Sequence, residues 1–349
     1  MRRLLSLLMV LFISLSMTSC GEPDKQRYEA EFLELFDTAT KIVGYADNEK
    51  EFMSQAKLIY DELKIYHELY DIYNDYEGIN NIKTINDNAG IAPVEVDHRI
   101  IDLLVFSKEA YGLSEGKVNV AFGSVLRIWH DYREEGSEYP DEAEVPSLEI
   151  LENAALHTDI DNVVIDETAG TVFLKDPEMS LDVGAIAKGY ATERVTEYAV
   201  ANGFVSGIIS VGGNVRTIGY KEEGNGLWDI GIQNPDKKSQ ESNIYITHLT
   251  NLSLVSSGDY ERYYTVDGKR YHHIIDPVTL FPAQYFTAVT VICEDSGMAD
   301  ALSTCIFNMP FEEGLAIIEN LPETEALWIY TDGAVKYSSR FEELISEGN

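Results

Sequence analysis

Cysteine is scarce in this chain, and the few cysteines form no metal or disulfide pattern. The 349 residues include 3 Cys, with no Cys-x-x-Cys pair and no cluster of His and Cys. A disulfide framework and a zinc site of the Cys/His type are therefore not indicated. Cys293 and Cys305 lie among apolar residues, so we expect both to be buried thiols.

Positive charge is also scarce. Lys and Arg total 26 against 60 Asp and Glu, which gives a formal net charge of -34. Nucleic acid is therefore not an expected partner, because binding to phosphates needs a basic surface. We interpret the acidity as a source of solubility outside the cell. An acidic surface would also favour basic partners, but no segment localises such a patch.

The chain lacks a hydrophobic run long enough for a stable membrane span, because the apolar run over 4–15 is too short. Two arginines precede this run, which gives it the form of a targeting segment. Met17-Thr18-Ser19-Cys20 then resembles a bacterial lipobox, with Met17 in place of the usual leucine. We expect a lipoprotein signal peptide over 1–19 and lipidation of Cys20. The alternative is an ordinary secretory signal followed by a chance cysteine.

The remaining sequence has no internal repeat, no low-complexity tract and no break in composition. We expect a lipidated polar tether over 20–30 and a single domain over 31–345. Apolar residues at helical spacing and the surrounding caps predict helices over 48–72, 97–111, 186–202, 298–308 and 311–320. Short apolar runs predict strands at 208–210, 228–232, 245–249, 252–256, 263–266, 288–292 and 326–330, with a hairpin over 162–175.

This order of elements indicates a fold class. Alternating helices and mostly antiparallel strands favour an α+β domain with helices packed on one side of the sheet. The stretch 133–145 is rich in Glu and contains a Gly and a Pro, so it predicts a loop.

A glycine-containing turn at 180–191 is the most informative segment, because an apolar strand there gives way to a helix. Glycine lets the backbone approach a ligand closely, and the first turn of a helix suits a phosphate. Asp182 and Lys188 lie in this segment, and Lys188 adds a positive charge for the same anion. A tight strand–helix turn with a solvated lysine is the alternative.

Asp300 and Thr304 are spaced i, i+4 on a predicted helix and therefore share one face. A carboxylate and a hydroxyl are hard oxygen ligands that suit Mg²⁺. By itself the pair is also compatible with an aspartate that caps the helix or interacts with its dipole. His273 is a candidate general base, since histidine accepts protons near neutral pH. A surface or packing role is the alternative for a lone histidine on a strand.

The chain resembles the FAD:protein FMN transferase (ApbE) family over roughly residues 30 to 340. The resemblance rests on ordered blocks rather than on any one motif: Ser180-Leu181-Asp182-Val183-Gly184-Ala185-Ile186-Ala187-Lys188-Gly189-Tyr190-Ala191, Val211-Gly212-Gly213-Asn214, Trp228-Asp229-Ile230-Gly231-Ile232-Gln233-Asn234-Pro235, Ser256-Ser257-Gly258-Asp259-Tyr260-Glu261-Arg262, His272-His273-Ile274-Ile275-Asp276-Pro277 and Asp300-Ala301-Leu302-Ser303-Thr304. The fold that the resemblance implies is α+β, T-fold-like, in one compact unit.

The resemblance also implies site residues. Mg²⁺ would be held by the side chains of Asp300 and Thr304, by oxygen from Ser303 and by the backbone carbonyl of Ala185. The resemblance selects His273 rather than His272 as the base. The two side chains would point to opposite sides of a strand. The flavin-contacting positions that match are Asp182, Lys188 and Ile274.

Upstream flavin contacts are implied less directly. Tyr76 aligns with a family segment counted back from Asn86, and it would stack on the isoalloxazine ring or simply pack. Lys117, Val118 and Asn119 replace a Gly-x-Phe-Asp strand, so Asn119 stands where the family has an acid. Phe36 begins the segment that replaces Met-Gly-Thr, in which Asp37 stands for glycine.

The function that the resemblance implies is Mg²⁺-dependent transfer of FMN from FAD to a Thr or Ser hydroxyl of an exported target flavoprotein, with release of AMP. Lipidation at Cys20 would anchor the enzyme at the extracytoplasmic face of the bacterial membrane. Two other functions are compatible with the sequence. One is metal-dependent hydrolysis of FAD to FMN and AMP. The other is a flavin-binding lipoprotein without turnover.

Overall fold

The computed structural model describes residues 25–347. The expected signal peptide over 1–19 and the lipidation site Cys20 lie outside these residues. The first strand, β1 (Gln26–Phe32), begins inside the range that we expected to be a tether, so residues 26–30 belong to the folded domain. Within 25–347, no helix has the length and apolar character needed to cross a membrane.

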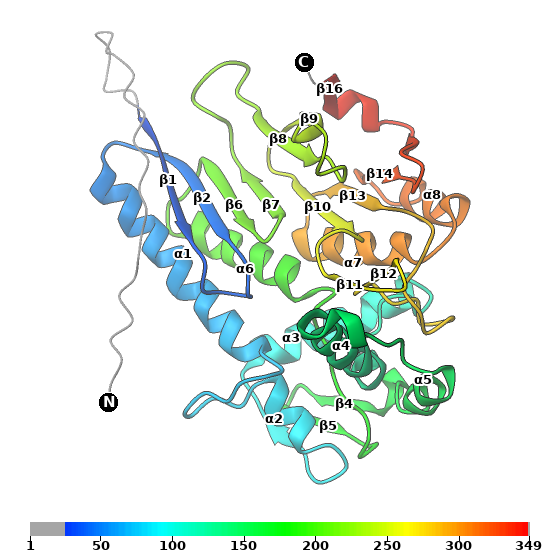
Figure 1. Cartoon of the computed structure of the whole chain (residues 1–349). Helices are drawn as coiled ribbons and strands as arrows, with labels where there is room; N and C mark the ends of the chain where they lie inside the picture. The colour runs from blue at the N-terminus through cyan, green and yellow to red at the C-terminus, as the bar shows by residue number, and fades with distance from the viewer. Residues whose placement is uncertain (1–24, 348–349) are drawn as a thin grey trace, which may run out of the picture.

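A large antiparallel sheet forms the centre of the molecule (Figure 1). Every strand pairing recorded in it is antiparallel, which confirms the expected sheet type. Its strands lie in the order β1, β2 (Thr40–Ala46), β6 (Gly207–Val211), β7 (Asn214–Ile218), β10 (Ser253–Gly258), β13 (Ala288–Cys293), β14 (Glu325–Ile329) and β15 (Val335–Tyr337).

Helices cover one face of this sheet (Figure 1). The first of them begins at a side-chain cap, because Asn48 accepts a hydrogen bond from the Glu51 amide, and its apolar stripe is buried. The predicted helices all exist within a few residues of their expected ends: α1 (Glu49–Tyr70), α3 (His98–Leu113), α6 (Ala187–Ala201), α7 (Ser296–Phe307) and α8 (Phe311–Glu319).

The other face of the sheet packs against a small second sheet. This sheet contains β8 (Trp228–Gln233), β9 (Asn243–Leu249) and β16 (Ile345–Glu347). Buried side chains of β8 and β9, such as Trp228 and Leu249, form a core with Leu254 and Leu327 of the large sheet. Strands β13 and β14 are consequently buried on both faces, so every position in them is buried and the strands are mostly apolar instead of alternating, with Thr290 and Glu325 as the polar exceptions.

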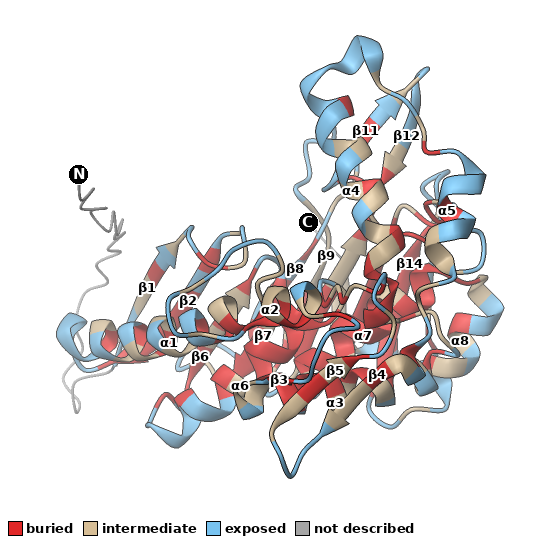
Figure 2. Cartoon of the chain, turned by 90° about the horizontal axis from the view of Figure 1, so that it is seen from below, coloured by how far each residue is buried: buried red, intermediate tan, exposed pale blue. Residues whose placement is uncertain are grey.

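A lobe beside the sheet contains α4 (Gly123–Glu138), α5 (Leu148–Ala155) and the hairpin β11 (Tyr263–Val266)–β12 (Lys269–His272). Figure 2 shows these elements together at the end of the molecule away from β1 and α1. The loop expected over 133–145 is wrong in its first part, because α4 continues to Glu138. Gly136 has a packing role there: a Cβ on it would lie 2.6 Å from the ring of Tyr264.

The remaining elements confirm the predicted hairpin and add a helix. Strands β4 (Val163–Asp166) and β5 (Thr171–Leu174) pair, and β3 (Val94–Glu95) pairs with β5. Helix α2 (Ile82–Asp87) was not expected from the sequence. Cys293 and Cys305 are both free and buried, as expected.

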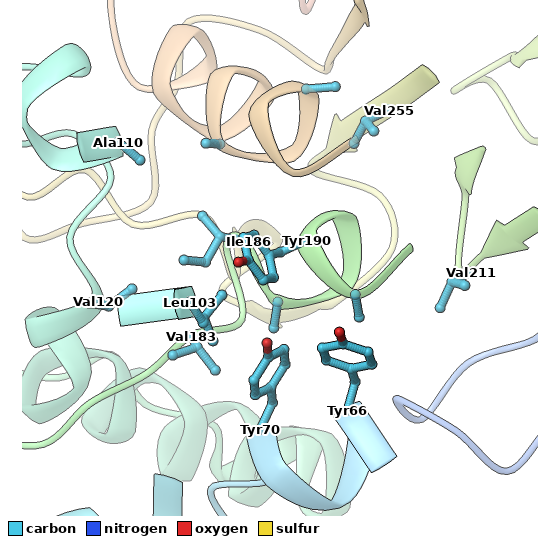
Figure 3. Close-up of a cluster of buried hydrophobic side chains, with 14 of the residues drawn as sticks. Tyr66, Tyr70, Leu103, Ala110, Val120, Val183, Ile186, Tyr190, Val211 and Val255 are labelled. Atoms are coloured by element: carbon cyan, nitrogen blue, oxygen red, sulfur yellow. The ribbon is translucent and has the colours of Figure 1, made fainter. Parts of the chain in front are cut away.

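Helix α6 carries the glycine turn and is anchored from several sides. Figure 3 shows Tyr66 and Tyr70 of α1 pointing towards its first turns, where Ile186 and Tyr190 lie. Farther along, Glu193 forms a buried ion pair with Arg216 of β7 at 3.1 Å and accepts a hydrogen bond from the Ser296 amide at 2.8 Å. The start of α6 is therefore held firmly against β7 and the start of α7.

Candidate active site

The glycine turn is fixed by one asparagine from α2. Asn86 donates to the carbonyl of Leu181 at 3.0 Å and accepts from its amide at 2.7 Å. Asp182 follows, and its carboxylate accepts a hydrogen bond from the Gly184 amide at 2.8 Å. Burial raises the pKa of Asp182, whereas the nearby positive charges lower it. The backbone then turns and α6 begins at Ala187.

Asp300 connects the three elements that meet at this turn. Its Oδ2 accepts hydrogen bonds from the Gly189 amide of α6 and from the Asn214 side chain at the start of β7, both at 2.8 Å. The Gly189 amide therefore donates to the Asp300 side chain and not to the carbonyl four residues earlier in the helix. Within residues 25–347, no backbone amide donates to that carbonyl, which belongs to Ala185.

The oxygen atoms left free here fit a Mg²⁺ ion. No hydrogen bond to the Asp300 Oδ1 or from the Thr304 hydroxyl is recorded among residues 25–347, and Thr304 lies one turn farther along α7. With the Ala185 carbonyl they form a set of hard oxygen donors. Ser303 is different, because its hydroxyl already bonds Ser257 and the Asp300 carbonyl. Residues 25–347 hold no cluster of three or more His, Cys, Asp or Glu that suits a metal.

We expect Gly189→Ala to destabilise the site strongly. A Cβ on Gly189 would lie 2.3 Å from the Ser296 carbonyl oxygen and 2.4 Å from the Asp300 Cβ, so α6 and α7 must separate. Overpacking of this kind costs about 1–3 kcal/mol of unfolding free energy. Gly112→Ala is the matched control, because it lies in helix α3 with nothing within 4 Å. Urea unfolding of both variants measures the difference, and equal stability would contradict the close approach.

The two adjacent histidines occupy different environments. His272 ends β12 and is buried, with its Nε2 2.7 Å from the Ala283 carbonyl and its Nδ1 accepting from the Ile274 amide at 3.2 Å. His273 follows the strand, and only its backbone makes a recorded hydrogen bond, to the Arg262 carbonyl at 3.0 Å. Its Nδ1 is enclosed without a hydrogen-bond partner. The structure therefore leaves the His273 ring free for a ligand and commits His272 to the fold.

The His273 ring is neutral at physiological pH. Burial lowers its pKa to about 3, and the positive charges of Arg262, Lys188 and Arg133 contribute in the same direction. A neutral imidazole has a lone pair that can accept a proton or a hydrogen bond. Lys188 also lowers the pKa of Asp300, which burial raises. Its charge thus acts on both the histidine and the oxygen donors.

Phe36 and Tyr76 lie together through a shared histidine. The Phe36 amide donates to Nδ1 of His67 at 3.2 Å, and the Tyr76 hydroxyl lies 3.4 Å from Nε2 of the same ring. Tyr76 also donates to Asp71 at 2.7 Å. The adjoining Thr38 meets the glycine turn before β7, since a Cβ on Gly212 would lie 2.6 Å from its hydroxyl. The Phe36 segment therefore borders the Gly-Gly-Asn turn.

The 117–119 segment is occupied by internal contacts. Lys117 forms an ion pair of 2.9 Å with Asp276, in the turn after His273. Val118 is buried in the core. Asn119 caps the short helix η1 (Val120–Phe122) by accepting from the Ala121 amide, and its amide group donates to the Thr158 carbonyl. Each of these side chains thus has a structural partner, and their flavin contacts stay predictions. Ile274 is likewise buried.

Three positioning residues were not predicted from the sequence: Asn86, Asn214 and His67. Asn214 belongs to the Gly-Gly-Asn block, and that block could have suggested a partner for Asp300. Asn86 served only to align Tyr76, because no helix was predicted around it. No sequence signal identified His67, because it joins Phe36 and Tyr76 only through tertiary packing.

Curated relatives support a family assignment. The model of the ApbE family matches residues 36–328. A FAD:protein FMN transferase of Klebsiella pneumoniae (strain 342) is 33% identical over 285 residues, which cover 81% of this chain and 84% of the relative. Another, from Treponema pallidum (strain Nichols), is 32% identical over 271 residues, covering 74% of this chain and 73% of the relative.

Solved structures agree. The crystal structure of the ApbE protein from Thermotoga maritima MSB8 matches with a TM-score of 0.80 and 31% identity, over 92% of this chain and 100% of that one. The flavin transferase ApbE from Vibrio cholerae matches with a TM-score of 0.75 and 25% identity, over 92% and 99%. These matches confirm the expected family and fold: the chain belongs to the ApbE family of flavin transferases.

Proposed function

We propose that the enzyme transfers FMN from FAD to a Thr or Ser hydroxyl of an exported flavoprotein, with Mg²⁺ as cofactor and AMP as the second product. The observation that carries this proposal is that the Nδ1 of His273 and the Oδ1 of Asp300 are both left without a hydrogen-bond partner among residues 25–347. The charge of Lys188 acts on both groups and lowers the pKa of each. A metal-held pyrophosphate and a proton acceptor are what phosphoryl transfer to a hydroxyl requires.

The protein's residues have separate roles in this reaction. The acceptor hydroxyl loses its proton to the His273 ring as its oxygen bonds to the FMN phosphorus. The bond from that phosphorus to the bridging oxygen breaks, and the oxygen leaves with AMP. Asp300, Thr304 and the Ala185 carbonyl would hold Mg²⁺, and the bound ion would neutralise negative charge on the pyrophosphate. Lys188 adds a further positive charge at the start of α6.

Two features distinguish this function from one of its alternatives. A flavin-binding protein without turnover needs neither a free histidine nor free oxygen donors beside Asp300, yet both are present. Hydrolysis of FAD uses the same residues with water as the acceptor. The two reactions differ only in the acceptor, so an assay that follows the acceptor separates them.

One assay tests the proposal. The purified protein is incubated with FAD, Mg²⁺ and a candidate acceptor, and the acceptor mass and the AMP formed are both measured. We expect the acceptor to gain one FMN for each AMP released. Release of AMP and free FMN with an unchanged acceptor mass would identify a hydrolase. Tight FAD binding without AMP would identify a carrier.

The location of the enzyme forms part of this proposal. Lipid on Cys20 would place the enzyme at the extracytoplasmic face of the cell membrane, where exported acceptors pass. The basic start, the short apolar run and the small residues before Cys20 support it. A fatty-acid probe should label the wild-type protein in cells and leave Cys20→Ala unlabelled.

A further inference from the structure

Two arginines of the lobe face the candidate active site, in a chain with an excess of acids. Arg133 lies on α4, and Arg262 directly precedes β11. The elements that carry them are packed together, since Gly136 of α4 meets the Tyr264 ring of β11. The Arg262 backbone is also tied to the site, because its carbonyl accepts from the His273 amide at 3.0 Å.

Both arginines share one space with Lys188. The pKa of His273 is lowered by the charges of Arg262, Lys188 and Arg133 together. The pKa of Asp182 is lowered by Lys188 and Arg133 in the same way. Lys188 comes from α6 and the arginines from the lobe, so charges carried by two different parts of the fold act on His273.

These guanidinium groups have no carboxylate partner. Within residues 25–347, neither Arg133 nor Arg262 takes part in an ion pair, and the one side-chain hydrogen bond of Arg133 joins it to Nδ1 of His130 at 2.8 Å. Arg133 is half-buried, and burial lowers its pKa. The charge of Arg262 acts in the same direction, whereas Glu134, Tyr73 and Asp182 oppose it. Arg262 is exposed, so the two like charges leave a place for an anion between a half-buried and an exposed guanidinium group.

We propose that Arg133 and Arg262 form a clamp for the pyrophosphate of FAD, opposite Lys188 and the metal-binding oxygens. The planar guanidinium group makes paired hydrogen bonds to phosphate oxygens, which a lysine cannot match. The clamp holds the phosphorus beside His273, where the acceptor hydroxyl must arrive. It rests on the proposed function for the identity of the ligand. It adds Arg133, which no sequence motif contained, and it gives a role to Arg262, the last residue of the Ser256–Arg262 block.

The test compares FAD with riboflavin, which lacks phosphate. Isothermal titration calorimetry at fixed Mg²⁺ measures both dissociation constants for the wild-type protein, Arg133→Gln and Arg262→Gln. We expect each substitution to weaken FAD binding about 10- to 100-fold, because it removes a charge-assisted hydrogen bond. Riboflavin binding should stay within about twofold of wild type. Arg262→Lys should weaken FAD binding less than Arg262→Gln does, since lysine keeps the positive charge but lacks the paired N–H donors of the guanidinium group.

Arg127→Gln is the matched control, because Arg127 is exposed on the same helix and has no ion pair among residues 25–347. Equal loss of FAD and riboflavin affinity would overturn the clamp, as would unchanged FAD affinity in both variants. Unchanged FAD affinity with a higher KM for the acceptor would assign the arginines to an acceptor carboxylate instead. Binding is measured without acceptor, so a wild-type protein that binds FAD but transfers nothing would refute only the proposed function.

Discussion

His273→Ala is expected to abolish detectable flavin transfer while FAD still binds. The substitution removes the side chain proposed to accept the acceptor proton, and general-base assistance is worth about 10²–10⁴ in rate. The phosphate contacts proposed for Lys188 and the oxygen donors beside Asp300 remain, so FAD affinity should change little. In-gel flavin fluorescence and acceptor mass measure transfer, and calorimetry measures FAD binding.

His272→Ala provides the contrast. His272 is buried and bonds the Ala283 carbonyl and the Ile274 amide, so its loss should lower the melting temperature. Below that temperature the variant should still flavinylate the acceptor. The assignment of the base would be reversed if His272→Ala were inactive while folded and His273→Ala were active. Activity in both would show that the proton goes elsewhere.

Asp300→Asn should remove most Mg²⁺-dependent activity and keep the fold. The amide preserves an oxygen for the Gly189 and Asn214 hydrogen bonds but removes the negative charge that binds the cation. Loss of such an electrostatic contribution costs about 10²–10³ in rate. AMP release across a Mg²⁺ titration measures the effect, with a melting curve to check folding. A wild-type rate at the same Mg²⁺ concentration would show that the metal site is elsewhere.

The same carboxylate predicts a pH dependence. Burial raises the pKa of Asp300, so its folded-state pKa lies above the usual aspartate value. Protons therefore compete with the cation as the pH falls towards that raised value. The Mg²⁺ concentration for half-maximal activity should increase on acidification, and Asp300→Asn should lose this dependence. Thr304→Val is a useful companion, because it removes an oxygen donor without a titrating group.

Local sequence patterns predicted five helices of the central body and four of the eight strands of the large sheet, β6, β10, β13 and β14. The apolar stripe of α1 is a pattern of residues close together in the sequence, and so are the turn residues of the β4–β5 hairpin. Such local patterns can be recognised without knowledge of the tertiary structure. Helix α4 was not predicted, and its last residues were predicted as a loop, for the opposite reason. Gly136 lowers the helical signal, but the Tyr264 ring requires a glycine at that position.

The candidate site also contains residues that local motifs identified and residues that only the tertiary structure places there. Asp182, Lys188, Asp300 and His273 stand in short motifs, so their selection needed only the linear sequence. Arg133 lies in a glutamate-rich stretch that resembles a solvated loop, and only the packing of α4 against the hairpin places it near His273. For Lys117 the alignment predicted a flavin contact, whereas the fold pairs it with Asp276. Long-range partners of this kind carry no local signature.

One proposed metal donor is a main-chain atom, and this determines where the enzyme tolerates substitution. The Ala185 carbonyl is free because the Gly189 amide turns to Asp300. A side-chain change at Ala185 leaves that oxygen in place, so a saturation scan of the chain would score the position as permissive. Gly189 touches no ligand in this proposal, yet any side chain there collides with α7. The scan would therefore report the metal site most clearly at a residue that does not bind the metal.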